Sequence, residues 1–217
     1  MKTAIVTGAA RGIGLATADI LRSQSWHVIM VDRDAKELQK QAAIRDQITA
    51  LCHDISDPEQ VNLMIKKVMA NRGQIDALVN NAGVADFGPL EETSFAQWRK
   101  VMETNLDGVF LCTQAALSAL KSSKGTIVNI ASISGLRAST LRVAYGTSKA
   151  AVIHLTQQQA VELGEFGIRA NSVSPGPVKT KLAMAVHSED IISAYHDAIP
   201  LNRYGSEAEV GHVIAFL

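Results

Sequence analysis

The sequence predicts an α/β fold, a doubly wound parallel sheet with helices on both faces. Three observations support this class. Short apolar runs alternate with helix-length amphipathic segments, a glycine-rich turn joins the first run to the first such segment, and no linker or repeat divides the 217 residues. Parallel strands need crossover connections, and right-handed crossovers place helices on both faces of one sheet. We therefore expect a single domain over residues 1–217.

The predicted strands are short and rich in apolar and β-branched residues. They are Thr3–Thr7, His27–Val31, Ile48–His53, Ala77–Asn80, Thr126–Ile130 and Ala170–Val173. The predicted helices between them include Gly14–Gln24, Pro58–Arg72, Ser94–Leu120 and a segment from Tyr145 to about Phe166. Asp57-Pro58 should start a helix, and Gly73 should end it. After the stop at Pro175-Gly176-Pro177, residues 179–200 are loosely patterned, and we expect a lid there.

Composition argues against several classes of function. Hydrophobic residues make up 47% of the chain and charged residues 19%, which is typical of a globular protein. The net charge is zero, which argues against a nucleic-acid partner, and no apolar run is long enough to span a membrane. The start shows no signal-peptide pattern, so we expect a cytoplasmic protein. Cys52 and Cys112 lack a CxxC pattern and should be buried free thiols, and the scattered histidines predict no metal site.

The glycine-rich turn after the first strand predicts a dinucleotide site. It reads Thr7-Gly8-Ala9-Ala10-Arg11-Gly12-Ile13-Gly14 and opens the first helix. Glycines there allow a tight turn and let the backbone approach a pyrophosphate at the positive helix N-terminus. A purely structural turn is the alternative, but the strand–glycines–helix context favours the dinucleotide.

The end of the second strand bears on the choice of cofactor. Asp32 follows the glycine turn by about 20 residues, and a carboxylate there binds ribose hydroxyls and repels a 2′-phosphate. Arg11 and Arg33 oppose this preference, since a guanidinium pairs with phosphate. We expect the carboxylate to outweigh arginines that are free to swing into solvent. NAD is therefore predicted, with NADP the weaker alternative.

Polar residues also follow the third and fourth strands. Ligands bind outside the carboxyl ends of parallel strands, so Asp54 and the run Asn80-Asn81-Ala82-Gly83 should face the cofactor. By chemistry alone, Asp54 could equally be a helix-entry residue, and the asparagines could be turn formers.

Three reactive groups could converge further along the chain. Ser132 closes the apolar run from Gly125, and Tyr145 and Lys149 are four residues apart on a predicted helix. Residues at this spacing share one helix face, so a hydroxyl, a phenol and an amine could meet at one point. Taken alone, the pattern favours a surface Tyr and Lys that merely share a helix face.

Taken together, these motifs resemble the short-chain dehydrogenase/reductase family, in its standard branch. The matching residues occur in family order from residue 3 to about 180: Thr7-Gly-x-x-x-Gly12-Ile13-Gly14, Asp54-Ile55, Asn80-Asn81-Ala82-Gly83, Asn105, Ser132, Tyr145-x-x-x-Lys149 and Pro175-Gly176. The resemblance implies a Rossmann fold and a cofactor site formed by Thr7, Gly8, Arg11, Gly12, Ile13, Gly14, Asp32, Arg33, Asp54, Ile55, Asn81, Ala82, Gly83, Tyr145, Lys149, Pro175, Gly176, Val178 and Thr180.

The resemblance also implies a mechanism of hydride transfer between nicotinamide and a carbinol or carbonyl carbon. Tyr145 would move the proton, and Lys149 would lower the phenol pKa and hold the nicotinamide ribose. Ser132 would orient the substrate oxygen, and Asn105 would hold a water in a proton relay. A free tyrosine has a pKa near 10, so a phenolate at neutral pH needs about 4 kcal/mol of stabilisation.

One departure from the family pattern concerns the C-terminus. Family chains continue through a last helix and a seventh strand, whereas this sequence stops at Leu217, within the expected helix. That strand contributes to a subunit interface in many relatives. A homo-oligomer, a tetramer or dimer, is the expectation from the family.

The substrate is less readable from the sequence. By position, Ser132, Ser134, Arg142 and Tyr145 are predicted to bind it, and further pocket candidates are Asp86, Phe87, Leu136, Pro177, Met184 and His187. The first hypothesis is an NAD-dependent dehydrogenase of a secondary alcohol: a small polyol, a sugar alcohol, or a cyclic or aliphatic alcohol. The alternatives are an NADPH-dependent 3-oxoacyl thioester reductase and a catalytically silent dinucleotide-binding regulatory protein.

Overall fold

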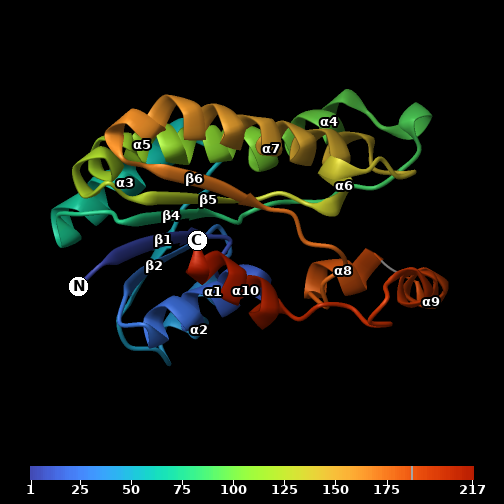
Figure 1. The fold of residues 1–217 in the computed structure, drawn as a ribbon, viewed down its shortest axis with the longest axis horizontal. Coiled ribbons are helices and arrows are strands. Elements are labelled where there is room, and N and C mark those ends of the chain that lie inside the picture. Colours follow the sequence, from blue (N-terminus) through green and yellow to red (C-terminus); the bar gives the residue numbers. More distant parts are fainter. Residues whose placement is uncertain (187) are drawn as a thin grey trace.

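A parallel sheet forms the centre of the protein, as seen in the computed structural model, which describes residues 1–186 and 188–217 (Figure 1). Within these residues the sheet has six strands in the order β3-β2-β1-β4-β5-β6, all paired in parallel. The strands are β1 (Thr3–Thr7), β2 (His27–Asp32), β3 (Ile48–Cys52), β4 (Ala77–Asn80), β5 (Thr126–Ile130) and β6 (Arg169–Val173). The sequence prediction of a doubly wound α/β fold is confirmed.

Helices cover both faces of the sheet. One face carries α3 (Pro58–Arg72), α4 (Phe95–Met102), α5 (Gly108–Ser123) and α7 (Val143–Leu163). The other carries α1 (Gly12–Ser23), α2 (Ala35–Ala42) and α10 (Glu207–Phe216), as Figure 1 shows. Short elements α6 (Ile133–Leu136), α8 (Lys181–Val186) and α9 (Glu189–Ala198) lie near the carboxyl ends of the strands, and single turns occur at Leu90–Glu92 and Gly164–Phe166.

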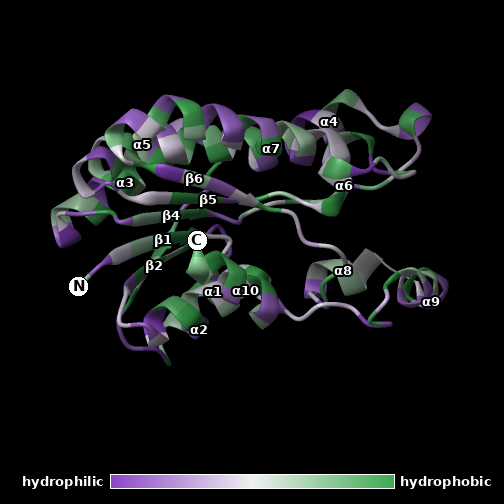
Figure 2. Ribbon diagram, in the orientation of Figure 1, coloured by the Kyte–Doolittle hydropathy of each residue, from purple (hydrophilic) through white to green (hydrophobic). Residues whose placement is uncertain are grey.

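Each face of the sheet has its own apolar layer. Ile5, Leu78 and Ile127 face α3 and α5, whereas Val6, Met30 and Val79 face α1 and α10, and all are at most 2% exposed. In Figure 2 the edge strand β6 is hydrophilic along much of its length, and α10 is mostly hydrophobic. Burial of both faces explains why the inner strands are continuous apolar runs.

Local signals fixed several boundaries as expected. The Asp57 side chain accepts hydrogen bonds from the backbone N–H groups of Glu59 (2.9 Å) and Gln60 (3.2 Å), and Pro58 occupies the first helical position. Gly73 ends α3 with a φ of 72°, a conformation that favours glycine. The short helix α2 was not predicted, although Ala35, Leu38 and Ala42 recur at a helical spacing, because eight residues are fewer than the window over which periodicity is read.

The predicted helix from Ser94 to Leu120 forms, but it is not a regular α-helix throughout. The helix is interrupted between α4 and α5 by a π-helical turn at Glu103–Asp107. Within this turn the fully buried Asn105 accepts a hydrogen bond from the Val84 N–H (2.8 Å) and donates to the Val84 carbonyl (2.9 Å). Hydrogen bonds to the loop after β4 thus favour the extra residue in the π-helical turn. Such contacts between distant segments could not be predicted from the periodicity of the sequence.

A buried network of polar side chains links the sheet to α5 and α7. The Asn80 amide donates to Asn129 Oδ1 (2.8 Å), and the Asn129 amide donates to Thr156 Oγ1 and Gln159 Oε1, both at 2.8 Å. The Gln159 amide then donates to Thr113 Oγ1 at 3.3 Å. These bonds join β4, β5, α5 and α7 through groups that would be costly to bury alone. Asn80 is therefore a core residue, and the expectation that it faces the cofactor together with Asn81, Ala82 and Gly83 is wrong.

The prediction for the cysteines is half right. Cys112 is buried, and burial raises the pKa of its thiol to about 12. Cys52 is exposed instead, because it ends the edge strand β3. Over the described ranges, none of the helices is both long enough and apolar enough to cross a bilayer.

Candidate active site

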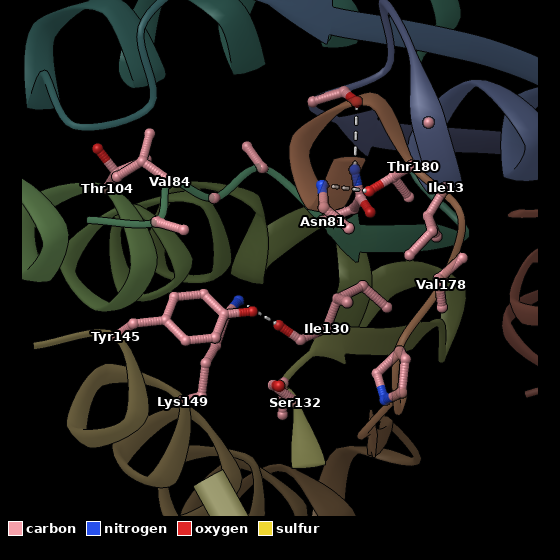
Figure 3. Close-up of a pocket in the computed structure, with 18 of the residues that line it drawn as sticks. Ile13, Asn81, Val84, Thr104, Ile130, Ser132, Tyr145, Lys149, Val178 and Thr180 are labelled. Carbon is pink, nitrogen blue, oxygen red and sulfur yellow. Dashed lines mark hydrogen bonds between the residues drawn. The ribbon is translucent and has the colours of Figure 1, made fainter. Parts of the chain in front are cut away.

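A cleft of about 380 Å³ lies at the carboxyl ends of the strands, where open parallel sheets bind ligands. Its walls come from the loops after β1 to β6, the first turns of α7, and residues of α8 and α9 (Figure 3). Most residues predicted from the sequence line it: Gly8, Arg11, Gly12, Ile13, Asp32, Arg33, Asp54, Ile55, Asn81, Ala82, Gly83, Ser132, Ser134, Arg142, Tyr145, Lys149, Pro175, Gly176, Val178 and Thr180. Thr7, Gly14 and Asn105 support this wall from behind.

The glycine turn is shaped for a close approach of backbone to ligand. Gly8 and Gly12 both have a φ of 64°. A Cβ on Gly14 would lie 2.3 Å from the Gly8 carbonyl oxygen and 2.5 Å from Asn81 Nδ2, so not even a methyl group fits. The helix that begins here has no side-chain cap on Arg11 and no acidic residue in its first turn. Its first N–H groups are therefore suited to an anionic pyrophosphate.

Thr7 and Asn81 fix this turn against the end of β4. Thr7 Oγ1 accepts hydrogen bonds from the N–H groups of Asn81 and Ala82, both at 3.0 Å. The Asn81 side-chain amide donates to the carbonyls of Thr7 (2.9 Å) and Gly8 (3.2 Å). The asparagine therefore does more than form a turn.

Asp32 is held in place at the end of β2. Its carboxylate accepts hydrogen bonds from the N–H groups of Ala10 (3.1 Å) and Asp34 (3.0 Å). A carboxylate has lone pairs left after these two bonds, so it can still accept from ribose hydroxyls. This geometry fits an adenosine with free hydroxyls.

The expectation that Arg11 and Arg33 are free in solvent is wrong. Arg11 forms an ion pair with Asp34, and this pair holds the pKa of the Asp34 carboxyl below its usual range. Arg33 Nη1 lies 3.8 Å from Asp54 Oδ2. Asp54 also accepts hydrogen bonds from Ser56, while Asp57 caps the following helix, so Asp54 is not the helix-entry residue. The positive charges of both guanidinium groups are thus balanced by neighbouring carboxylates.

Lys149 is buried beneath the cleft. Its side chain is 5% exposed and Nζ donates to the Ile130 carbonyl at 2.7 Å, a bond drawn in Figure 3. Burial lowers the pKa of this ammonium to about 8. Nζ lies 5.8 Å from the centre of the Tyr145 ring, so the two side chains do meet on one face of α7.

The phenol of Tyr145 reaches the same part of the cleft as Ser132. A hydrogen bond with Ser132 and the charge of Arg142 act to lower the pKa of Tyr145, but burial raises it and outweighs them. The expected low phenol pKa is therefore not produced by the groups of the chain itself. Ser132, at the end of β5, also accepts a hydrogen bond from the Ser134 N–H at 3.1 Å.

The side chain of Asn105 connects two segments of the chain through hydrogen bonds. Besides its two bonds to Val84, its amide donates to Ser148 Oγ at 3.0 Å, and Ser148 neighbours Lys149 in α7. A Cβ on Gly83 would lie 3.3 Å from Asn105 Oδ1 and 3.5 Å from Lys149 Nζ. The loop after β4 and the start of α7 are thus locked together beside the reactive groups.

The substrate candidates divide into two groups. Phe87 and Pro177 line the cleft with Arg142 and Ser134, whereas Asp86, Leu136 and Met184 do not, and Leu136 is 60% exposed. His187 lies outside the described residues. Lining residues that the prediction missed include His53, Thr104, Ile133, Lys181 and Tyr195. His53 follows β3 directly, so the strand-end rule could have found it, but Tyr195 comes from a helix that folds back over the cleft.

Over the described ranges, no cluster of three or more His, Cys, Asp or Glu side chains could hold a metal ion. The glycine turn and the Ser132–Tyr145–Lys149 group lie at two ends of the same cleft. Comparison with known proteins bears on both. The family described as short chain dehydrogenase matches residues 2–191.

The chain belongs to this family. It is 36% identical over 218 residues to the meso-2,3-butanediol dehydrogenase of Serratia marcescens, covering 100% of this chain and 86% of that one. It is 35% identical over 224 residues to the 3-oxoacyl-(acyl-carrier-protein) reductase FabG of Staphylococcus aureus, covering 100% and 90%. The crystal structure of gox2181 superimposes with a TM-score of 0.96 at 32% identity, covering 100% of this chain and 88% of that one. This short-chain dehydrogenase is thus an oxidoreductase by family.

Proposed function

We propose that the protein is an NAD(H)-dependent oxidoreductase that transfers a hydride between nicotinamide and a small secondary alcohol or its ketone. One observation carries the proposal. The phenol of Tyr145, with Ser132 beside it and Lys149 beneath it, faces the same cleft as the glycine turn and Asp32. The similarity to a butanediol dehydrogenase supports a small polyol or aliphatic alcohol as substrate.

The cofactor fits the residues that line the other end of the cleft. Gly8 and Gly14 leave no room for a Cβ against the surrounding chain, Gly12 has a positive φ, and the uncapped start of α1 supplies N–H donors for a pyrophosphate. Asp32 would accept hydrogen bonds from the adenosine ribose. Bound there, the nicotinamide supplies a carbon that accepts or returns a hydride.

The residues of the chain then divide the remaining work. Ser132 donates to the substrate oxygen and orients it. Tyr145 takes the hydroxyl proton during oxidation and returns it during reduction. The ammonium of Lys149 stabilises negative charge on the phenol and binds the nicotinamide ribose. Asn105, through Val84 and Ser148, keeps the loop and helix that carry these groups in position.

Three further features complete the proposal. Residues 179–200 act as a lid within a single domain of residues 1–217, which is supported by Lys181 and Tyr195 in the cleft wall. The free thiols of Cys52 and Cys112 support a cytoplasmic location. An exposed apolar surface on α4, α5 and α7 supports a homo-oligomer.

The test is turnover by Tyr145→Phe. The variant keeps the ring but removes the hydroxyl, so kcat should fall by about 10³-fold while NADH affinity changes less than about 3-fold. Steady-state rates on 2,3-butanediol and 2-butanol and NADH fluorescence titration measure the two quantities. Undiminished turnover would rule out this proton donor.

A second candidate, an NADPH-dependent 3-oxoacyl thioester reductase, is favoured by the similarity to FabG. Rates with NADH and NADPH on 3-oxobutanoyl thioesters and on 2-butanone separate the two. A higher kcat/KM for the thioester with NADPH would replace the first proposal. Binding of NADH without turnover of any alcohol, ketone or thioester would instead indicate a silent regulatory protein.

A further inference from the structure

The substrate end of the cleft contains a cation that the mechanism does not use. Arg142 is the residue before α7, three positions ahead of Tyr145, and its half-buried side chain lines the cleft. Residues three apart at a helix start lie on the same side. The guanidinium and the reactive phenol are therefore presented to the same space.

Two neutral aromatic residues position this guanidinium. Its Cζ lies 4.5 Å from the centre of the Phe87 ring, and its Nη2 donates to the Tyr195 hydroxyl at 3.2 Å. Phe87 in turn packs edge-on against Tyr145, with ring centres 5.7 Å apart. One ring thus separates the cation from the catalytic phenol, and the cation is held without being neutralised.

The charges along the cleft are unevenly distributed. The acidic residues that line it, within the described chain, are Asp32 and Asp54, and both belong to the adenosine end. There the guanidinium groups of Arg11 and Arg33 have carboxylate partners. Across residues 1–186 and 188–217, Arg142 has no carboxylate within ion-pair distance.

A guanidinium has five N–H donors in a planar fork that matches a carboxylate, and one of the five is used by Tyr195. We propose that the substrate is a short hydroxy acid whose carboxylate is bound by Arg142. This inference rests on the proposed function. With the acid group anchored, oxidation would break the carbinol C–H bond, a bound NAD would accept the hydride, and Tyr145 would accept the hydroxyl proton. An oxo acid forms, and the carboxylate is unchanged.

The experiment compares charged and neutral versions of one carbon chain. Oxidation of 2-hydroxybutanoate, 3-hydroxybutanoate and 4-hydroxypentanoate with NAD is measured against their N-methylamides. At least one acid should exceed its amide by about 100-fold in kcat/KM, mainly through KM, since charge-assisted bonds discriminate strongly. Arg142→Met should reduce that ratio to about 3-fold or less, and Arg142→Lys should retain part of it.

The matched control is Arg137→Met, which removes an exposed arginine of the same segment outside the cleft and should leave the ratio unchanged. Equal rates for acid and amide in the parent enzyme would overturn the inference while leaving the proposed function intact. So would an equal loss for acid and amide in Arg142→Met, because that result assigns Arg142 a purely structural role through Phe87 and Tyr195.

Binding tests the inference separately from turnover. Butanoate has the carboxylate but no reactive carbinol, and its affinity for the protein with NAD is measured by equilibrium dialysis. Binding that weakens at least 10-fold in Arg142→Met supports the carboxylate site even if no alcohol is oxidised. Butanoate binding that is absent or independent of Arg142 overturns it.

Discussion

At the scale of single residues, burial governs the ionisation of the reactive groups. Burial lowers the pKa of Lys149 from 10.5 to about 8, and it raises the pKa of Tyr145. Both shifts disfavour charge inside the protein. Lys149, for which we propose a catalytic role, therefore reduces stability at neutral pH.

Because the buried ammonium of Lys149 reduces stability, its removal should raise the free energy of unfolding by an amount that depends on pH. Between pH 8 and 10.5 the unfolded chain holds more protons at this lysine than the folded one, so the free energy of unfolding rises with pH. In Lys149→Met the free energy of unfolding should no longer rise with pH in this range. At pH 7 the variant should be more stable than the parent by about 2 kcal/mol in the free energy of unfolding. Removing the buried charge should contribute about 3 kcal/mol, and losing the hydrogen bond to the Ile130 carbonyl should cost about 1 kcal/mol.

Urea unfolding of parent and variant at pH 7, 8, 9 and 10 measures this difference. Lys66→Met, on the exposed side of α3, serves as the control and should leave the pH profile unaltered. A Lys149→Met profile that runs parallel to the parent's would show that this ammonium is not destabilised.

Asp32 sets the second prediction at this scale. Asp32→Ala should lower the ratio of kcat/KM with NAD to that with NADP by about 10-fold or more, because repulsion of the 2′-phosphate is lost. Asp32→Asn keeps an oxygen for the ribose without the charge and should give an intermediate ratio. The ribose role fails if both variants retain the parent's cofactor ratio.

At the scale of elements, polar side chains decide how helices meet the sheet. Asn129 bonds to Asn80, Thr156 and Gln159, so one side chain joins β4, β5 and α7. Asn129→Ala should lower the free energy of unfolding by about 3–5 kcal/mol, because it leaves buried partners unpaired.

Urea or thermal unfolding measures this loss. Asn71→Ala, at an exposed position of α3, is the control and should stay within about 0.5 kcal/mol of the parent. A loss below about 1 kcal/mol for Asn129→Ala would mean that water satisfies the orphaned groups.

At the scale of the whole molecule, large apolar side chains are exposed on the helices that cover one face of the sheet. Phe95, Phe110 and Val161 are 76%, 48% and 81% exposed, and Leu106, Phe110 and Leu155 line a groove whose other residues include the charged Arg99, Glu103 and Asp107. We expect this face to be covered by a second copy of the chain. Phe110→Glu should shift the protein toward monomers in sedimentation velocity, whereas Ile44→Glu, on the loop after α2, should not. A parent protein that is monomeric at 50 μM would remove the basis for the expectation.

The strands of the sheet could be predicted from the sequence, whereas the arrangement of side chains in the cleft could be predicted only in part. Strands follow from short apolar runs, so all the predicted ones formed with ends within a residue or so. Motif residues such as Gly14 and Asp32 were found because their chemistry depends on local spacing. The π-helical turn at Asn105 and the Phe87–Arg142–Tyr195 cluster depend on segments distant in sequence, which leave no periodic signal.

The polar network in the core also bears on how the chain reaches this fold. Asn80 and Asn129 are direct partners in the β4–β5 ladder. A slip of one strand by one residue would turn its asparagine to the opposite face of the sheet and leave the partner amide unpaired. Misaligned pairings would thus be penalised before the sheet closes, although the two strands are separated by a long crossover that makes such searches slow. The asparagine pair therefore selects the correct strand alignment during folding.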